Sequence, residues 1–201
     1  LYDIAGRTRK RQNELAGKFG ITGIQGGGAG CVLTTREFSA KIYDFITHYY
    51  ENDYEMIRSF HYFRHFRISS NLRIMIAKDD YENGILKKLF GNRFRYLYPL
   101  PWNGPLCVLA GMDFSEEDIK KAAAITARYS KGKGLDEVEI VLSESPEAEP
   151  SAVYKTVPAT PGEVDKFRID SDFRKLPDLE KLICRKSQTP QQPPAEQEPG
   201  S

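Results

Sequence analysis

The 201-residue sequence predicts an α+β fold, because segments with apolar residues at helical spacing alternate with short runs typical of strands. Hydrophobic residues make up 40% of the chain and charged residues 28%, a balance typical of a globular domain with a packed core. From about residue 187 the chain is mainly Gln, Pro, Glu and Ser without periodicity, which predicts a disordered tail.

Two helices are predicted in the N-terminal quarter. The first covers residues 8–19, has a basic first half and ends at Gly20. The second follows a glycine-rich loop, and Thr34 and Glu37 have the spacing of a capping box at its start. Its apolar face consists of Phe38, Ile42, Phe45, Ile46 and Tyr49.

Capping signals predict the later helices. A short helix is expected from Asp53, and a longer one over residues 79–90 has acidic residues at its start and Gly91 as its stop. The clearest helix begins after Ser115 as N-cap. A last short helix is expected in TPGEVDKF. The expected buried side of the helix after Ser115 consists of Ile119, Ala122, Ala123 and Ile125.

Alternating runs predict the strands. YFRHFRIS and LRIMIAKD form a hairpin around Ser-Ser-Asn, with Arg64 and Phe66 facing one way and His65 and Arg67 the other. RFRYLYPLP and PLCVLAG follow around the turn PWNG, and Cys107 is expected to be buried. LDEVEIVLSE and AVYKTV complete the predicted strands.

The charge is divided unevenly along the chain. Residues 1–135 hold 21 Lys and Arg against 14 Asp and Glu, a net +7, and residues 136–201 carry a net −6. No apolar run approaches the roughly 18 residues of a membrane span. The chain opens at Leu1 without an initiator Met or a leader, so we expect a fragment with further residues upstream rather than a secreted protein. An odd number of cysteines without a C-x-x-C pair favours a reducing, cytoplasmic setting. No basic amphipathic helix with a large apolar face is predicted, so no membrane partner is expected.

Cys31 is the candidate nucleophile. Three cysteines without a C-x-x-C pair argue against a disulfide framework and a four-ligand zinc site, so no metal is expected. Cys31 precedes a predicted helix start, where the field favours a thiolate. It also fits a small apolar residue in a glycine-rich turn, and no complete catalytic or P-loop motif is present.

The region from Arg58 to Arg95 favours nucleic-acid binding. It carries nine Lys and Arg against three Asp and Glu, interleaved with Tyr and Phe, which suits phosphate contacts and base stacking. The candidate RNA contacts are Arg64, His65, Arg67, Lys78, Lys87, Lys88, Arg93 and Arg95.

Two resemblances follow from these motifs. TRKRQNELAGKFGI with GGGAGCVLTTREFSAKIYDFI resembles the end of the catalytic domain of tRNA 2-thiouridylases, which are PP-loop ATP pyrophosphatases. FRHFRI, LRIMIAKDDYENGILKKL, GPLCVLAG and ITARYSKGKG resemble the NFACT RNA-binding module. In the family pattern V-G-R-N-x-x-E-N, Ala77, Lys78 and Asp79 replace G-R-N, whereas Glu82 and Asn83 are kept.

The resemblances imply three parts: residues 1–50 as the end of an α/β catalytic domain, 51–170 as an RNA-binding module and 171–201 as a tail. They imply a sulfurtransferase that thiolates a tRNA uridine, with Cys31 carrying sulfur from a donor protein. ATP would bind upstream of Leu1, so the fragment would be incomplete for catalysis. The alternatives are a non-catalytic RNA-binding module in tRNA or ribosome-associated processes, and a protein-interaction domain using AVYKTV.

Overall fold

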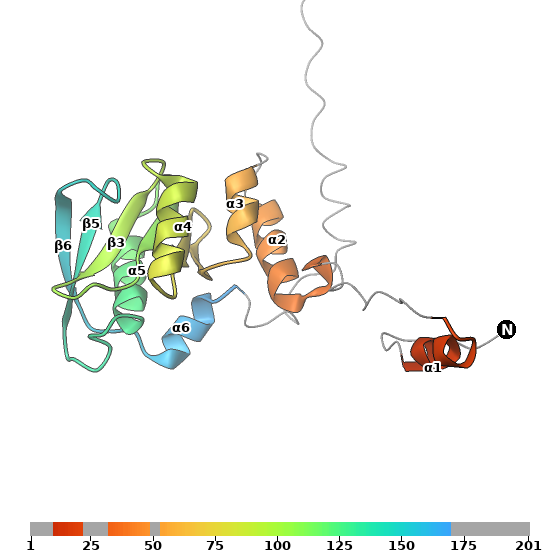
Figure 1. The fold of residues 1–201 in the computed structure, drawn as a ribbon. Helices are drawn as coiled ribbons and strands as arrows, with labels where there is room; N and C mark the ends of the chain where they lie inside the picture. The colour runs from red at the N-terminus through yellow and green to blue at the C-terminus, as the bar shows by residue number, and fades with distance from the viewer. Residues whose placement is uncertain (1–9, 22–31, 49–52, 170–201) are drawn as a thin grey trace, which may run out of the picture.

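A computed structural model describes residues 10–21, 32–48 and 53–169 (Figure 1). Within these ranges a six-stranded antiparallel sheet lies between two layers of helices. The elements are α1 (Lys10–Lys18), η1 (Val32–Thr34), α2 (Arg36–His48), α3 (Tyr54–Ser59), β1 (Arg64–Ser69), β2 (Leu72–Ile76), α4 (Asp80–Phe90), β3 (Arg95–Leu100), β4 (Cys107–Gly111), α5 (Glu116–Arg128), β5 (Val138–Ser143), β6 (Pro150–Thr156) and α6 (Pro161–Phe167).

The strand order is β1-β2-β4-β3-β5-β6. The predicted hairpin is confirmed, since Phe66 pairs with Ile74 in the antiparallel register of β1 and β2. β4 lies between β2 and β3 and is antiparallel to both, so β2 and β3, which α4 connects, run parallel to each other. Every predicted strand is present, and the α+β class is confirmed.

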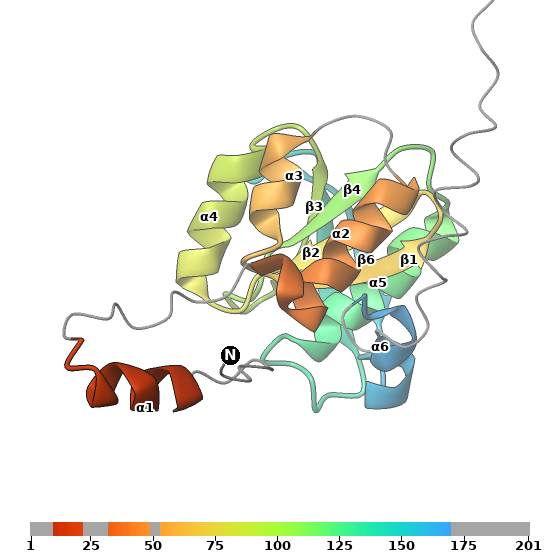
Figure 2. The same ribbon diagram turned by 90° about the vertical axis from the view of Figure 1, so that its right-hand side faces the viewer.

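Both faces of the sheet are covered (Figures 1 and 2). Leu72, Ile74 and Ile76 of β2 face a core completed by α5 and α6. Met75, between them in sequence, faces a second core completed by α2, α3 and α4. Because successive strand residues point to opposite faces, β2 is buried along its whole length.

Local capping signals match the helix starts closely. Ser115 Oγ accepts a hydrogen bond from Asp118 N at 3.1 Å, and the Asp118 carboxylate accepts one from Ser115 N in return. The expected buried face of α5 is confirmed. α2 begins at Arg36, after a 3-10 turn, rather than directly after Thr34, and Ile46 on its predicted apolar face is exposed.

The boundary predicted after residue 50 does not follow the packing of α2. Phe38 and Phe45 of α2 belong to the same core as Tyr96 of β3, and Lys41 Nζ donates a hydrogen bond to the carbonyl oxygen of Phe60 at 3.0 Å. α2 therefore packs against the sheet that begins at residue 64. Cys31 and the predicted tail lie outside the described residues.

Candidate nucleic-acid interface

The basic residues predicted to contact RNA lie on several different surfaces. Arg64 and Lys78 lie at one end of the sheet, where β1 begins and β2 has ended. Arg93 and Arg95 lie at the opposite end, where β3 begins. Lys87 and Lys88 lie on α4, and His65 and Arg67 face α2. The structure therefore does not unite the eight residues in one site.

His65 and Arg67 belong to a buried charge cluster between α2 and the sheet, which also includes Lys41, Asp44 and Arg73. Arg67 Nε and Nη2 donate to the two carboxylate oxygens of Asp44 at 2.9 and 2.5 Å. Arg67 thus has its guanidinium committed to an internal carboxylate. The predicted role of Arg67 in RNA contact does not suit this position.

His65 is completely buried, so the prediction that its ring contacts RNA is not compatible with its place in the fold. Arg73 Nη2 donates to Nδ1 at 3.0 Å, which leaves Nε2–H to donate to the carbonyl oxygen of Ser59 at 3.1 Å. Burial, and then the positive charges of Arg73 and Lys41, hold the pKa of His65 well below 6.5. The ring is therefore neutral at physiological pH.

Arg93 and Arg95 flank a small pocket of about 200 Å³ at the other end of the sheet. Arg93 Nη2 forms an ion pair with Asp53 Oδ2 at 2.6 Å. The guanidinium of Arg95 lies over the ring of Phe114, 4.5 Å from its centroid. Both side chains thus have partners within the chain.

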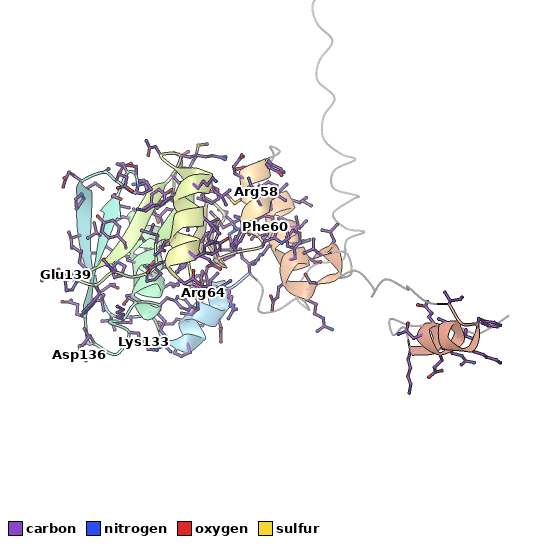
Figure 3. All side chains as sticks on the ribbon, viewed as in Figure 1. Arg58, Phe60, Arg64, Lys133, Asp136 and Glu139 are labelled. Carbon is purple, nitrogen blue, oxygen red and sulfur yellow. The ribbon has the colours of Figure 1, made fainter. Side chains whose placement is uncertain are left out.

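The opposite end of the sheet carries the basic end, which we define as Arg64, Lys78, Lys131 and Lys133. The Arg64 guanidinium lies 4.6 Å from the centroid of the Tyr129 ring, and its Nη1 donates to the carbonyl oxygen of Ala77 at 3.4 Å. These contacts join the start of β1, the residue before Lys78 and the end of α5. Lys131 and Lys133 are exposed in the loop after α5, and Figure 3 shows Arg64 and Lys133 at the same end.

The residues aligned with the family pattern after β2, both those replaced and those kept, have structural partners. Asp79 caps α4 by accepting from Glu82 N at 2.8 Å. Glu82 accepts from the backbone and the ammonium of Lys78, at 2.9 and 3.0 Å. Asn83 Oδ1 accepts from Leu106 N at 2.9 Å, and its Nδ2 donates to the Gly104 carbonyl oxygen at 3.3 Å. Glu82 therefore holds the segment after β2 to α4, and Asn83 fixes the loop before β4 against the same helix.

A groove of about 610 Å³, here called the α4 groove, lies beside the basic end. One wall is the stripe of α4 formed by Asp80, Asn83, Gly84 and Lys87, and the other is the segment from Tyr98 to Gly104. A Cβ on Gly132 would lie 2.7 Å from Trp102 Cζ3, so the loop carrying Lys131 and Lys133 supports the back of this wall. The α4 groove and the basic end are thus contiguous.

Sequence reasoning missed Tyr98, Trp102, Lys131 and Lys133. PWNG predicted a turn correctly, but its lone Trp gained significance only when the fold placed it against Gly132. The run SKGKG was the signal for the two lysines, and it entered only as part of a motif that resembles the NFACT module.

The described residues contain no group of three or more His, Cys, Asp or Glu side chains able to hold a metal ion. Within the same ranges, every helix is too short or too polar to cross a bilayer.

The basic end gathers positive charge at one end of an α+β domain, an arrangement that attracts polyanions. The profile of the NFACT protein RNA binding domain matches residues 64–168, slightly more than half of the chain. The chain therefore belongs to the NFACT RNA-binding domain family, and it contains an RNA-binding domain.

Among solved structures, the chain is similar to the C-terminal part of the fibronectin/fibrinogen-binding protein from Streptococcus suis. The identity is 18% and the TM-score 0.44, over 53% of this chain and 48% of the other. The chain thus spans about half of that structure. Comparison with curated proteins gave no match.

Proposed function

We propose that the chain binds tRNA, and that the basic end makes the phosphate contacts. The family match supports RNA as the partner, and the exposed cations of the basic end supply the sequence-independent attraction that phosphates require. Lys131 and Lys133 are the main candidates for these phosphate contacts, because both are exposed, whereas Lys78 pairs with Glu82.

Charge reversal at the basic end tests the proposal. Lys131→Glu with Lys133→Glu should weaken the binding of fluorescently labelled tRNA at least ten-fold in an anisotropy titration. Lys120→Glu is the control, since Lys120 is exposed on α5, the helix before this loop, about 12 Å along the axis from its last residue, Arg128. Equal losses in both proteins, or no binding by the parent chain, would contradict the proposal.

A finer proposal concerns the reaction that the domain serves. The resemblance of residues 8–46 to tRNA 2-thiouridylases supports a tRNA-modifying sulfurtransferase, in which Cys31 takes sulfur from a donor protein and a segment outside these 201 residues binds ATP. The test is thiouridine formation by the longer protein with tRNA, ATP and a sulfur source, measured by mass spectrometry of digested tRNA. Cys31→Ser should abolish the product.

The second candidate is an RNA-binding role without catalysis, in tRNA or ribosome-associated processes. It is favoured by the family match, which begins at residue 64 and leaves out the glycine-rich segment altogether. Under this alternative, Cys31→Ser leaves tRNA binding and every activity of the longer protein unchanged.

A further inference from the structure

The α4 groove has one wall without a side chain in its middle. Gly84 lies at the centre of α4 and on the groove-facing stripe. A glycine inside a helix costs about 1 kcal/mol relative to alanine. No atom lies within 4 Å of the position that a Cβ would occupy on Gly84, so packing does not require the glycine. Its effect on the fold is to keep the groove open.

The opposite wall carries two half-buried aromatic rings, Tyr98 and Trp102. Gly132 leaves no room behind the Trp102 ring, and Gly104 folds closely against Pro99, where a Cβ would lie 2.3 Å from Pro99 Cγ. Asn83 holds the same loop to α4 through its two hydrogen bonds. The aromatic wall is therefore positioned before any ligand binds, which lowers the entropic cost of stacking.

A cation stands at the rim of this groove. Lys87 lines the groove and forms an ion pair with Glu147 at 2.8 Å, and both side chains are exposed to solvent. An exposed pair of this kind is weak, so a phosphate can replace the carboxylate at little cost. The groove thus combines aromatic faces, polar groups and a cation within a volume typical of small-ligand sites.

We propose that the α4 groove binds one unpaired nucleotide of the RNA, with the base against Trp102 and Tyr98 and its phosphate at Lys87. This inference rests on the proposed RNA binding and specifies the form of the RNA. A base in a duplex is paired and stacked, so its face cannot reach the aromatic wall, whereas a single-stranded or looped-out base can. Duplex RNA binds the basic end alone.

The fluorescence of Trp102 reports on this site alone, because it is the only tryptophan of the chain. Titration of the full chain with a single-stranded RNA oligonucleotide should quench this fluorescence. The same RNA sequence annealed into a duplex should still bind the chain, as measured by fluorescence anisotropy. It should quench the Trp102 fluorescence by less than one fifth of the amount seen with the single strand.

Gly84→Leu fills the groove and tests the location. It should weaken the binding of the single-stranded oligonucleotide at least five-fold and remove the quenching, while the melting temperature stays equal or rises because leucine favours helix. Gly162→Leu in α6 is the matched control, since its Cβ position is also free of neighbours and lies outside the groove. It should change binding less than two-fold.

The outcomes separate the two proposals. RNA binding by anisotropy without quenching, equal quenching by both RNA forms, or unchanged binding in Gly84→Leu would overturn the nucleotide site and leave RNA binding intact. Absence of any RNA binding by the parent chain would overturn both.

Discussion

Arg73 Nη1 lies 3.3 Å from Asp44 Oδ2, and this ion pair joins β2 to α2 in the interior of the protein. Arg73 has no exposed side-chain surface, and its guanidinium also lies over the ring of Phe60, 4.5 Å from the centroid. Asp44 receives two further hydrogen bonds from Arg67. One carboxylate thus compensates two arginines, so α2 is bound to the sheet by charge as well as by apolar contact.

Asp44→Ala should therefore destabilise the fold by about 3–5 kcal/mol, because it leaves buried positive charge without its counter-ion. Urea unfolding followed by circular dichroism measures the change. Glu139→Gln is the control: its pair with Lys155 is 3.5 Å long and exposed on both sides, so less than about 1 kcal/mol is expected. Similar losses in the two variants would show that the buried cluster does not fix α2.

His65 should make stability depend on pH. The pKa of His65 lies well below 6.5 in the folded state and near 6.5 in the unfolded chain. At pH values between these two pKa values, the unfolded state therefore binds more protons than the folded state. Stability is then lost as the pH falls below about 6.5, by up to about 1.4 kcal/mol per pH unit. Urea unfolding between about pH 7 and pH 5, the range around that value, measures the slope.

His65→Gln should flatten this slope, and His61→Gln should retain it because His61 is exposed. A slope that is the same in the parent and in His65→Gln would assign the pH dependence to other groups.

Salt should weaken tRNA binding steeply, because cations that neutralise phosphates release condensed counterions. Each phosphate contact contributes about 0.7–0.9 to the slope of log affinity against log salt concentration. Lys131→Ala and Lys133→Ala should each lower that slope by about this amount, whereas Lys120→Ala should leave it unchanged. Parallel salt profiles for all four proteins would place the phosphate contacts elsewhere.

Cys107 and Cys31 should differ in reactivity. Burial raises the pKa of Cys107 to about 12, so its thiol should resist alkylation at neutral pH until the protein unfolds. The proposal for Cys31 requires the opposite, an apparent pKa below the ordinary value of about 8.5. Iodoacetamide labelling against pH, read by mass spectrometry of the peptides, measures both. An ordinary pKa at Cys31 would favour the role without catalysis.

The features that the sequence predicted correctly are the ones that contacts between residues close in sequence determine. Ser115 and Gly91 mark the ends of helices through their own backbone contacts, so α4 and α5 were found. The position of β4 between β2 and β3 could not be predicted from the alternation of apolar and polar residues. This alternation indicates which side chains share a face of a strand, but not which strands lie next to each other. Likewise, Arg67 looked accessible because its partner, Asp44, lies more than 20 residues earlier in the sequence.

The same limit applies to the candidate site. Basic residues between Arg58 and Arg95 were counted together, although β3 returns Arg93 and Arg95 to the far end of the sheet. Lys131 lies at the same end of the sheet as Arg64 because α5 ends at its C-cap, Tyr129, and the Arg64 guanidinium lies over the Tyr129 ring. Composition thus indicated a nucleic-acid partner, and the fold determines which of the cations lie together at one end of the sheet.

The two outer strands of the sheet differ in how they avoid unwanted pairing. Beside β1, Arg168 forms a bridge with Phe66, and Ile169 N donates to the carbonyl oxygen of His65 at 3.2 Å. β6 pairs with β5, and among the described residues its other side has no strand partner. β6 begins with Pro150 and carries the exposed Lys155, both of which discourage addition of a further strand. Among the residues that the structure describes, β6 is thus the edge open to edge-to-edge aggregation, and its Pro150 and Lys155 already disfavour that route.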